Sequence, residues 1–173
     1  MRRRGQLVLV AAALVAVALA PVVIAYLQLG YHDDVTATAD YGDPTAATVG
    51  ALDRAVVPAS TGIPGRYAWA DRGAAVTAIR GELRPRIEHL RTARLDHGTV
   101  TAIRYNESAA RRFRDANCPS GPDRQFGDCA ADRGVVVQER LGRTHVLGVA
   151  VDVTTTTERG ETTVTAVLRP VER

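Results

Sequence analysis

The hydrophobic and polar positions of the 173-residue chain follow three patterns in turn: an apolar run, a helical spacing of apolar residues, and an alternation typical of strands. The apolar run extends from Leu7 to Leu29, and between Gly5 and His32 no side chain is charged at neutral pH. Its 23 residues would form a helix of roughly 35 Å, enough to cross a hydrocarbon core of about 30 Å. We therefore expect residues 6–30 to be a transmembrane helix, with the lipid bilayer as its partner.

The charges on either side of this run predict its orientation. Three arginines precede it and four aspartates follow it: Arg2, Arg3, Arg4, and then Asp33, Asp34, Asp40, Asp43. Because basic flanks stay in the cytoplasm, residues 1–5 should be a cytoplasmic basic leader, and the chain beyond residue 30 should be extracellular, anchored in the cell membrane by a single pass. The alternative is a cleaved secretory signal, cut after Ala20 or Ala25, which would remove most of the helix.

Beyond the membrane, an acidic stretch of small residues precedes the first segment with helical spacing. Residues 31–48 contain four Asp and no Arg, and they offer little apolar surface to offset the entropy of ordering, so we expect a flexible stalk. Apolar residues from Val49 to Val56 then have the spacing of a short helix, which Pro58 should end. Residues 49–173 should form the extracellular domain.

The clearest helix is expected from about Asp71 to about Leu95. Its apolar residues recur three and four positions apart and form one stripe: Val76, Ile79, Leu83, Ile87 and Leu90. Pro85 lacks an amide hydrogen, so the Gly81 carbonyl should lose its helical partner and the helix should bend there.

Three arginines, Arg80, Arg84 and Arg91, line up beside this apolar stripe. One interpretation is a site for anionic headgroups, surface glycans or an acidic partner. The other, which we favour on the sequence, is a solvated helix face. Pairs of glutamate and arginine at helical spacing support it: Glu82 with Arg86 and Glu88 with Arg91.

After Gly98 the apolar positions alternate. Four strands are expected, at residues 99–105, 135–139, 144–156 and 161–169. A short helix should lie between the first two strands, beginning at Asn106 or Ser108 and reaching about Ala116.

The links between the later strands predict how they pair. Residues 140–143 and 157–160 are short connections that contain Gly, as hairpins require. Sequential hairpins should form an antiparallel β-meander of about four strands, with the Thr-rich face left to solvent. The long helix should cover the other face, to which β-branched and Leu side chains contribute: Leu147, Val149, Val151 and Val153. The expected fold class is α+β, with an N-terminal transmembrane helix followed by a helix packed on this meander.

Composition narrows the range of partners. All 22 basic residues are Arg, and once the three in the leader are set aside, the remaining 19 balance 19 acidic residues. A nucleic-acid-binding domain needs excess positive charge on its folded part, because phosphate neutralisation drives its affinity. The sequence therefore argues against nucleic acid as a partner.

Residues with candidate chemistry are few. The only two cysteines, Cys118 and Cys129, predict one extracellular disulfide, because the alternative, a metal site with nearby aspartates, lacks both zinc and calcium spacing. Asn106 opens an Asn-Glu-Ser sequon, so it is either an N-glycosylation site or only a helix cap. No histidine pair has metal-binding spacing, and no phosphate loop or nucleophile elbow is present. We expect no metal, no cofactor and no enzymatic activity.

The leader resembles a specific kind of signal. The segment Arg2–Gln6, which runs straight into the apolar helix, resembles the class III signal peptide of archaeal type IV pilins and archaellins. The resemblance implies cleavage after Gly5 by a prepilin peptidase, with Gln6 as the new amino terminus and the helix retained. An ordinary uncleaved signal anchor remains the alternative.

The rest of the chain resembles an uncharacterised family of membrane-anchored, pilin-like haloarchaeal proteins. The likeness runs from RGQLVLVAAALVAVALAPVVIAYLQLGYHDDV through YAW and NCPSGPDRQFGDC to GVVVQE and THVLGVAVDVT. The helix lacks the Ser-Pro-Val-Ile-Gly type opening of major pilins, so the resemblance implies a minor or accessory structural or adhesion component, with other pilin-like subunits as partners. The alternatives are a solitary surface-anchored binding module and, less favoured, a surface hydrolase.

Overall fold

The computed structural model describes Leu19, residues 43–121 and residues 126–170. The chain divides into two compact units, Met1–Asp43 and Pro44–Arg173, and every element named below belongs to the second. Across the described part, no helix has the length and apolar character that a membrane span requires. The basic leader, the transmembrane helix (Leu19 excepted) and stalk residues 31–42 lie outside the described residues and stay predictions.

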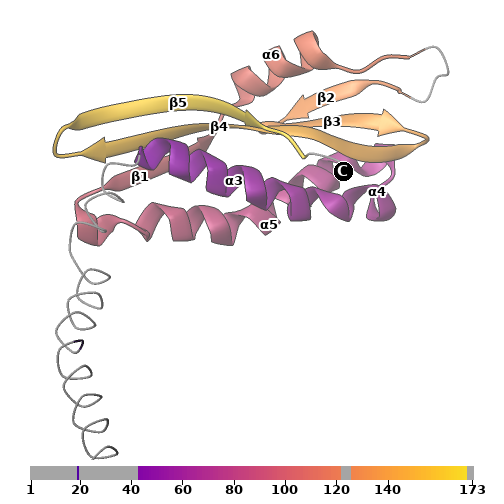
Figure 1. The fold of residues 1–173 in the computed structure, drawn as a ribbon. Helices are drawn as coiled ribbons and strands as arrows, with labels where there is room; N and C mark the ends of the chain where they lie inside the picture. Colours follow the sequence, from indigo (N-terminus) through magenta and orange to yellow (C-terminus); the bar gives the residue numbers. More distant parts are fainter. Residues whose placement is uncertain (1–18, 20–42, 122–125, 171–173) are drawn as a thin grey trace, which may run out of the picture. The chain divides into compact units, whose positions relative to one another are not determined.

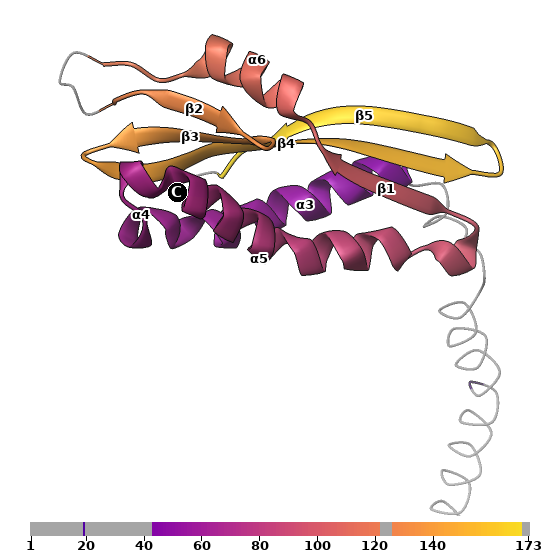
Figure 2. The same ribbon diagram turned by 180° about the vertical axis from the view of Figure 1, so that it is seen from behind.

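The second unit is α+β and is built on a five-stranded antiparallel sheet (Figures 1 and 2). Its strands are β1 (Val100–Tyr105), β2 (Cys129–Asp132), β3 (Val135–Arg140), β4 (Arg143–Thr157) and β5 (Gly160–Leu168). The 15-residue β4 is central: it pairs with β3 over its first half, with β1 over its second half, and with β5 from residue 149 to 157.

The antiparallel sheet covered by helices is confirmed, but it has five strands instead of about four, and the first predicted strand is not part of the meander. Strands β2, β3, β4 and β5 follow one another as hairpins, whereas β1 inserts beside β4, a neighbour that is distant in sequence. The prediction missed β2, which has only four residues and contains two alanines, so alternation is not visible in it. In each of two hairpin turns, Arg133–Gly134 and Leu141–Gly142, both residues have a positive φ. This backbone conformation matches the twist of a tight hairpin.

Three helices cover one face of the sheet: α3 (Pro44–Thr61), α4 (Ile63–Arg66) and α5 (Arg72–Thr92). Their buried residues pack against the valines of β3 and β4 in one hydrophobic core: Leu52, Val56, Ile63, Val76, Ile79 and Leu83 from the helices, and Val135, Val137, Val149, Val151 and Val153 from the strands. The predicted helix and its apolar stripe are thus confirmed, since Ala75, Val76, Ile79, Leu83 and Ile87 are its buried residues.

The first helix corrects two predictions. It begins at Pro44, so residues 44–48 belong to the folded unit and not to the stalk, and Thr45 and Thr48 are buried. It also continues through Pro58 to Thr61 instead of ending there. Pro58 leaves the Arg54 carbonyl without its helical donor, and the helix nevertheless continues because it buries apolar residues on both sides of the proline, among them Val56 and Ala59.

A β-bulge corrects the expected burial of β4. The register between β3 and β4 shifts between Val136 and Val137, so Val137 opposes Val146 while Val136 opposes Gly148. Leu147 is the extra residue of β4 at this bulge, and its side chain lies on the opposite face of the sheet from Val149 and the other valines of the main core. One extra residue in one strand therefore changes which side chains share a face.

The second face of the sheet is also partly covered. Helix α6 (Glu107–Asn117) packs Ala109 and Ala110 against Val136 and Ala150. Two short 3₁₀ turns, Trp69–Asp71 and Leu95–His97, complete the elements. The expectation that this face is left to solvent thus holds only for the threonines toward the ends of β4 and β5, which α6 does not cover.

Candidate functional site

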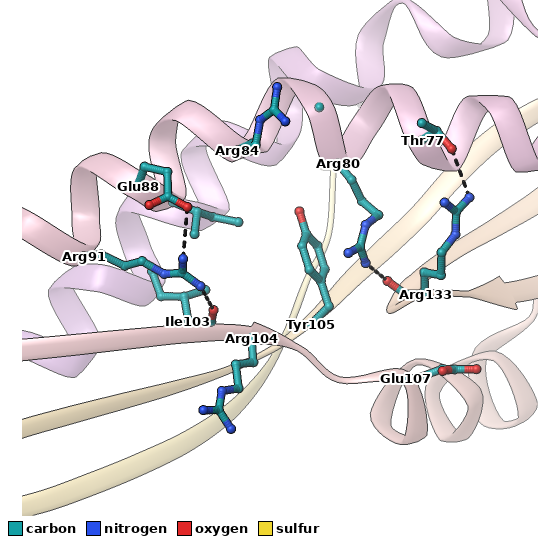
Figure 3. Close-up of a pocket in the computed structure, with 12 residues that line it drawn as sticks. Thr77, Arg80, Arg84, Glu88, Arg91, Ile103, Arg104, Tyr105, Glu107 and Arg133 are labelled. Carbon is teal, nitrogen blue, oxygen red and sulfur yellow. Dashed lines mark hydrogen bonds and ion pairs between the residues drawn. The ribbon is translucent and has the colours of Figure 1, made fainter.

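A groove with five arginines runs between α5 and β1 (Figure 3). Its volume is about 790 Å³, within the range of small-molecule pockets, and it is open to solvent. It is lined by Thr77, Arg80, Gly81, Arg84, Ile87, Glu88 and Arg91 of α5, by Ile103, Arg104 and Tyr105 of β1, by Glu107 at the start of α6, and by Arg133 of the β2–β3 turn.

Helix α5 supplies the row of arginines, because Arg80, Arg84 and Arg91 recur at intervals that return to one side of a helix. Over 11 residues this row extends about 16 Å along the helix axis. Arg133 continues it from the sheet: its guanidinium donates to the Gly73 carbonyl at 3.0 Å and to the Thr77 hydroxyl at 3.1 Å. Arg133 is also ion-paired with Asp132 at 3.1 Å, so the groove arginines without an acidic partner among the described residues are Arg80, Arg84 and Arg104.

Tyr105 stands across the groove with its hydroxyl toward α5 (Figure 3). The guanidinium of Arg80 lies over its ring, 3.9 Å from the ring centre, and donates to the Arg133 carbonyl. The hydroxyl is buried and has no hydrogen-bond partner among the residues that the structure describes. Burial raises the pKa of this hydroxyl above its ordinary value, and the charge of Arg80 lowers it by less, so the phenol stays protonated at neutral pH.

Gly81 and Pro85 shape the wall of the groove formed by α5. Pro85 has no amide hydrogen and so cannot bond the Gly81 carbonyl in the helical pattern. A Cβ placed on Gly81 would meet no other atom within 4 Å, so the groove leaves the backbone open at this point. The wall of the groove therefore has open space beside Gly81.

The acidic residues of the groove are already paired. Glu88 binds Arg91 at 3.0 Å, as predicted, and Arg91 also donates to the Ile103 carbonyl at 2.8 Å. Glu107 binds Arg111 of its own helix at 2.7 Å. Within the described part of the chain, Arg80 and Arg84 make no ion pair with an acidic side chain, and the predicted pair Glu82–Arg86 does not form.

The sequence showed these arginines only as one face of α5, and the structure adds β1 and the β2–β3 turn as the other side of a groove. Arg80 and Arg84 are exposed to solvent at their ends, as a solvated face requires, but they also border a groove with Tyr105 and Arg133. Sequence reasoning missed the contributions of Tyr105, Gly81 and Arg133. The only local signal was the Arg-Gly pair of a hairpin turn at Arg133, which says nothing about contact with α5.

Asn106 acts as the cap of α6. Its side-chain oxygen accepts from the Ala109 amide at 2.8 Å, and its amide nitrogen donates to both carboxylate oxygens of Asp152 at 2.8 and 2.9 Å. The Thr165 hydroxyl also donates to Asp152, and these two donors lower the pKa of the Asp152 carboxyl. The nitrogen that would carry a glycan is thus engaged within the fold. The geometry supports the cap interpretation, and glycosylation of Asn106 stays a prediction.

We expect Asn106→Ala to lower the free energy of unfolding by about 1–2 kcal/mol, because it removes a helix cap and two donors to Asp152. Chemical denaturation at pH 7 measures this, with Asn117→Ala, at the exposed end of the same helix, as the matched control that should change stability by less than about 0.5 kcal/mol. Equal losses for both variants at pH 7 would contradict the cap.

The hydrogen bonds to Asp152 also make stability depend on pH. Because the pKa of Asp152 is lowered on folding, the contribution of its carboxylate to the free energy of unfolding is present above the ordinary carboxyl pKa and is lost as the pH falls through the lowered value.

Cys118 and Cys129 form the predicted disulfide, with their Cα atoms 6.0 Å apart. It joins the end of α6 to the start of β2. The buried Gln138 of β3 holds the same loop, since its amide nitrogen donates to the Pro119 carbonyl at 2.7 Å and to the Gly127 carbonyl at 3.3 Å. The loop is therefore fastened to the sheet by a covalent and a hydrogen-bonded connection.

The other predicted site residues are placed as follows. Arg2, Arg3, Arg4, Gly5 and Gln6 lie outside the described residues. In the described ranges, no group of three or more His, Cys, Asp or Glu residues is arranged to hold a metal ion. The arginine groove is thus the site with the most distinctive chemistry in the part of the chain that the structure describes.

The chain matches the family of unknown function DUF7261 over residues 1–169. No curated protein matches the chain, and no solved structure matches it. The family match includes both the apolar N-terminal run and nearly all of the folded unit, so the two occur together in the family pattern.

Proposed function

We propose that this chain, which belongs to the DUF7261 family of unknown function, is a membrane-anchored extracellular adhesion component that binds an anionic ligand in its arginine groove. The observation that carries this proposal is the groove itself. Arg80 and Arg84 border it without acidic partners in the described part, while its two glutamates are neutralised by other arginines.

The charge distribution implies that anion binding would depend on the groove and not on the overall charge of the protein. The chain beyond the leader has no net charge, so it has no general attraction for polyanions. Guanidinium groups bind carboxylates, sulfates and phosphates through two parallel hydrogen bonds, which gives a groove selectivity that overall charge does not give. Anchoring by residues 6–30 would hold this groove outside the cell, next to surface ligands.

A test of the groove uses the full chain in a neutral detergent. We expect it to bind dextran sulfate but not uncharged dextran, and Arg84→Gln should weaken that binding by about tenfold, the effect of losing one charge-assisted contact. Arg86→Gln is the matched control, because Arg86 is an exposed arginine of the same helix that does not line the groove. A loss of equal size in both variants would contradict the proposed site.

A pilin-like subunit is the second candidate, favoured by the pattern from Arg2 to Gln6 in front of the apolar run. In this role the Ala-rich helix would first retain the protein in the membrane and then pack against neighbouring helices, since small residues allow close approach. Such a subunit could carry the same groove on its outer domain, so the two candidates are compatible.

Mass spectrometry of the amino terminus tests the pilin-like role. Purified from its own membranes, the protein should begin at Gln6 if a prepilin peptidase removes the leader. Gly5→Leu should then leave the leader in place, whereas Gln6→Asn should still be cut. An intact start would exclude the pilin-like role and leave the anchored binding module, whereas a start beyond Ala20 would exclude both the pilin-like role and the membrane anchor.

A further inference from the structure

Strand β5 forms an open edge of the sheet. Three strands have a neighbour on one side only, namely β1, β2 and β5. Of these, β2 has only four residues, and beside β1 lies α5, whose Arg91 donates to the Ile103 carbonyl. In contrast, β5 has nine residues, and its outer edge makes no backbone hydrogen bond within the described part of the chain (Figure 1).

The hydrogen bonds of Ala150 identify the residues on this outer edge. The Ala150 amide donates to the Gly134 carbonyl and its carbonyl accepts from the Asn106 amide, so Ala150 faces the β1 and β3 side of β4. Because backbone groups alternate between the two edges of a strand, the adjacent Val149 faces β5, where it lies opposite Leu168. By the same alternation, every second residue of β5 directs its N–H and C=O away from β4: Glu161, Thr163, Thr165 and Val167.

This strand lacks the features that usually protect a free edge. Edge strands are normally short, or they carry Pro, a bulge or charges that oppose pairing with another chain. From Gly160 to Leu168 there is no Pro, the pairing with β4 is regular, and Glu161 is the one charged residue. Threonine and valine, which favour strands, occupy five of the nine positions. The outer edge of β5 is therefore suited to pairing with a further strand.

We propose that two copies of this chain pair through β5, antiparallel and about a two-fold axis at Thr165, so that their five-stranded sheets join into one. In this register Thr165 lies opposite Thr165 of the second copy, and Thr163 lies opposite Val167 of the second copy. Glu161 then lies opposite Arg169 of the second copy. This pairing goes beyond the arginine groove and does not depend on it.

Hydrogen bonding and charge both select this register. Only residues with outward backbone groups can bond one another, and a centre at Thr165 pairs all four of them and also Arg169, which directly follows the strand. A shift by two residues in either direction leaves one of these five unpaired and separates Glu161 from Arg169. Opposite charges that face each other across two strands stabilise the pair, whereas like charges destabilise it. Pro170 has no amide hydrogen, so the pairing should end there.

The same pairing would cover apolar surface on the helix-covered face of the sheet. Leu168 of β5 is buried on that face, and Val164, which has the same parity, is one of the exposed large hydrophobic residues. In the proposed register Val164 lies opposite Ala166 of the second copy, so part of its exposed surface would be removed from water. The expected anchor at residues 6–30 would raise the effective concentration of the two copies, which allows a small interface to suffice.

Single cysteines test the two-fold axis in membranes that contain the full chain. Copper phenanthroline should link Thr165→Cys into a dimer, because hydrogen-bonded residues of antiparallel strands have Cα atoms about 5.5 Å apart, within the disulfide range. Thr163→Cys is the matched control, because this threonine lies on the same edge but would be about 13 Å from its own copy. Cys118 and Cys129 are already joined, so the added thiol is the free one. Equal linking of both variants, or no linking of Thr165→Cys, would overturn the proposal.

Charge reversal tests the register in the Thr165→Cys background. Glu161→Arg and Arg169→Glu should each slow the linking by about tenfold, because each places like charges opposite each other twice in the dimer. The double exchange should restore the rate to within about threefold. Both residues are exposed, so the Tm should stay unchanged in all three variants and slower linking would not come from misfolding. Single reversals without effect, or a double exchange that fails to restore the rate, would show that β5 does not pair in this way.

Discussion

Replacing Ile79 by alanine should lower the free energy of unfolding by about 2–5 kcal/mol, the usual effect of truncating a fully buried aliphatic side chain. Ile79 lies in the middle of the stripe of α5, is 0% exposed, and belongs to the core shared by α3, α5 and the sheet. Removing its three outer carbons leaves a cavity between two helices and the valines of β4, because close-packed neighbours relax only partly. Denaturant unfolding followed by circular dichroism measures the change.

Leu95→Ala is the control for this substitution. Leu95 is also a large aliphatic residue, in the 3₁₀ turn that follows α5, but it is 48% exposed. Its truncation should change the free energy of unfolding by less than about 0.5 kcal/mol. If Ile79→Ala were equally mild, α5 would not pack on the sheet as described, and the groove between α5 and β1 would lose its basis.

The second large effect is expected at the disulfide. Replacing both Cys118 and Cys129 by serine should lower the free energy of unfolding by roughly 3 kcal/mol, because the cross-link closes a short loop and so reduces the entropy of the unfolded chain. The hydrogen bonds of Gln138 to this loop do not replace the cross-link, since they are absent from the unfolded state that the disulfide restricts. Thermal unfolding of the double variant should show a clearly lower Tm.

A reductant gives the matched control. Adding it to the unmodified protein should lower the Tm toward that of the double serine variant, and adding it to the variant should change nothing. A protein whose Tm is indifferent to the reductant, although both thiols titrate as free, would show that Cys118 and Cys129 do not stabilise the fold. Intact thiols in freshly purified protein would also argue against an extracellular location.

Much of the fold was predictable because the period of apolar residues depends only on local geometry. The spacing from Val76 to Ile87 predicted α5, and alternation predicted β1, β3, β4 and β5 nearly to their ends. The glycines of the two predicted hairpins were recognisable for the same reason, since the positive φ at Gly142 and Gly160 is a local requirement. The disulfide followed from a count of two cysteines.

The errors came where distant contacts outweighed a local preference. Pro58 should end a helix by itself, yet α3 continues because its residues on both sides of the proline are buried in the core. Simple alternation along β4 would place Leu147 on the helix-covered face, but the bulge beside Val136 adds one residue to β4 and so moves Leu147 to the other face. The position of β1 beside β4 was likewise not readable from the order of the strands.

By itself, the sequence predicted most of the helical and extended residues and the apolar side of each helix and of most strands. The orientation of the chain in a membrane, from the apolar run and the three arginines before it, stays a prediction, because those residues lie outside the described ranges. These properties depend on periodicity and on the placement of charge along the chain. Only the tertiary structure decided that the arginines of α5 form one side of a groove. The contact of Arg133 with Thr77, 56 positions away, and the position of the Tyr105 hydroxyl against α5 depend on how β1 and the β2–β3 turn pack on that helix, which no local pattern encodes.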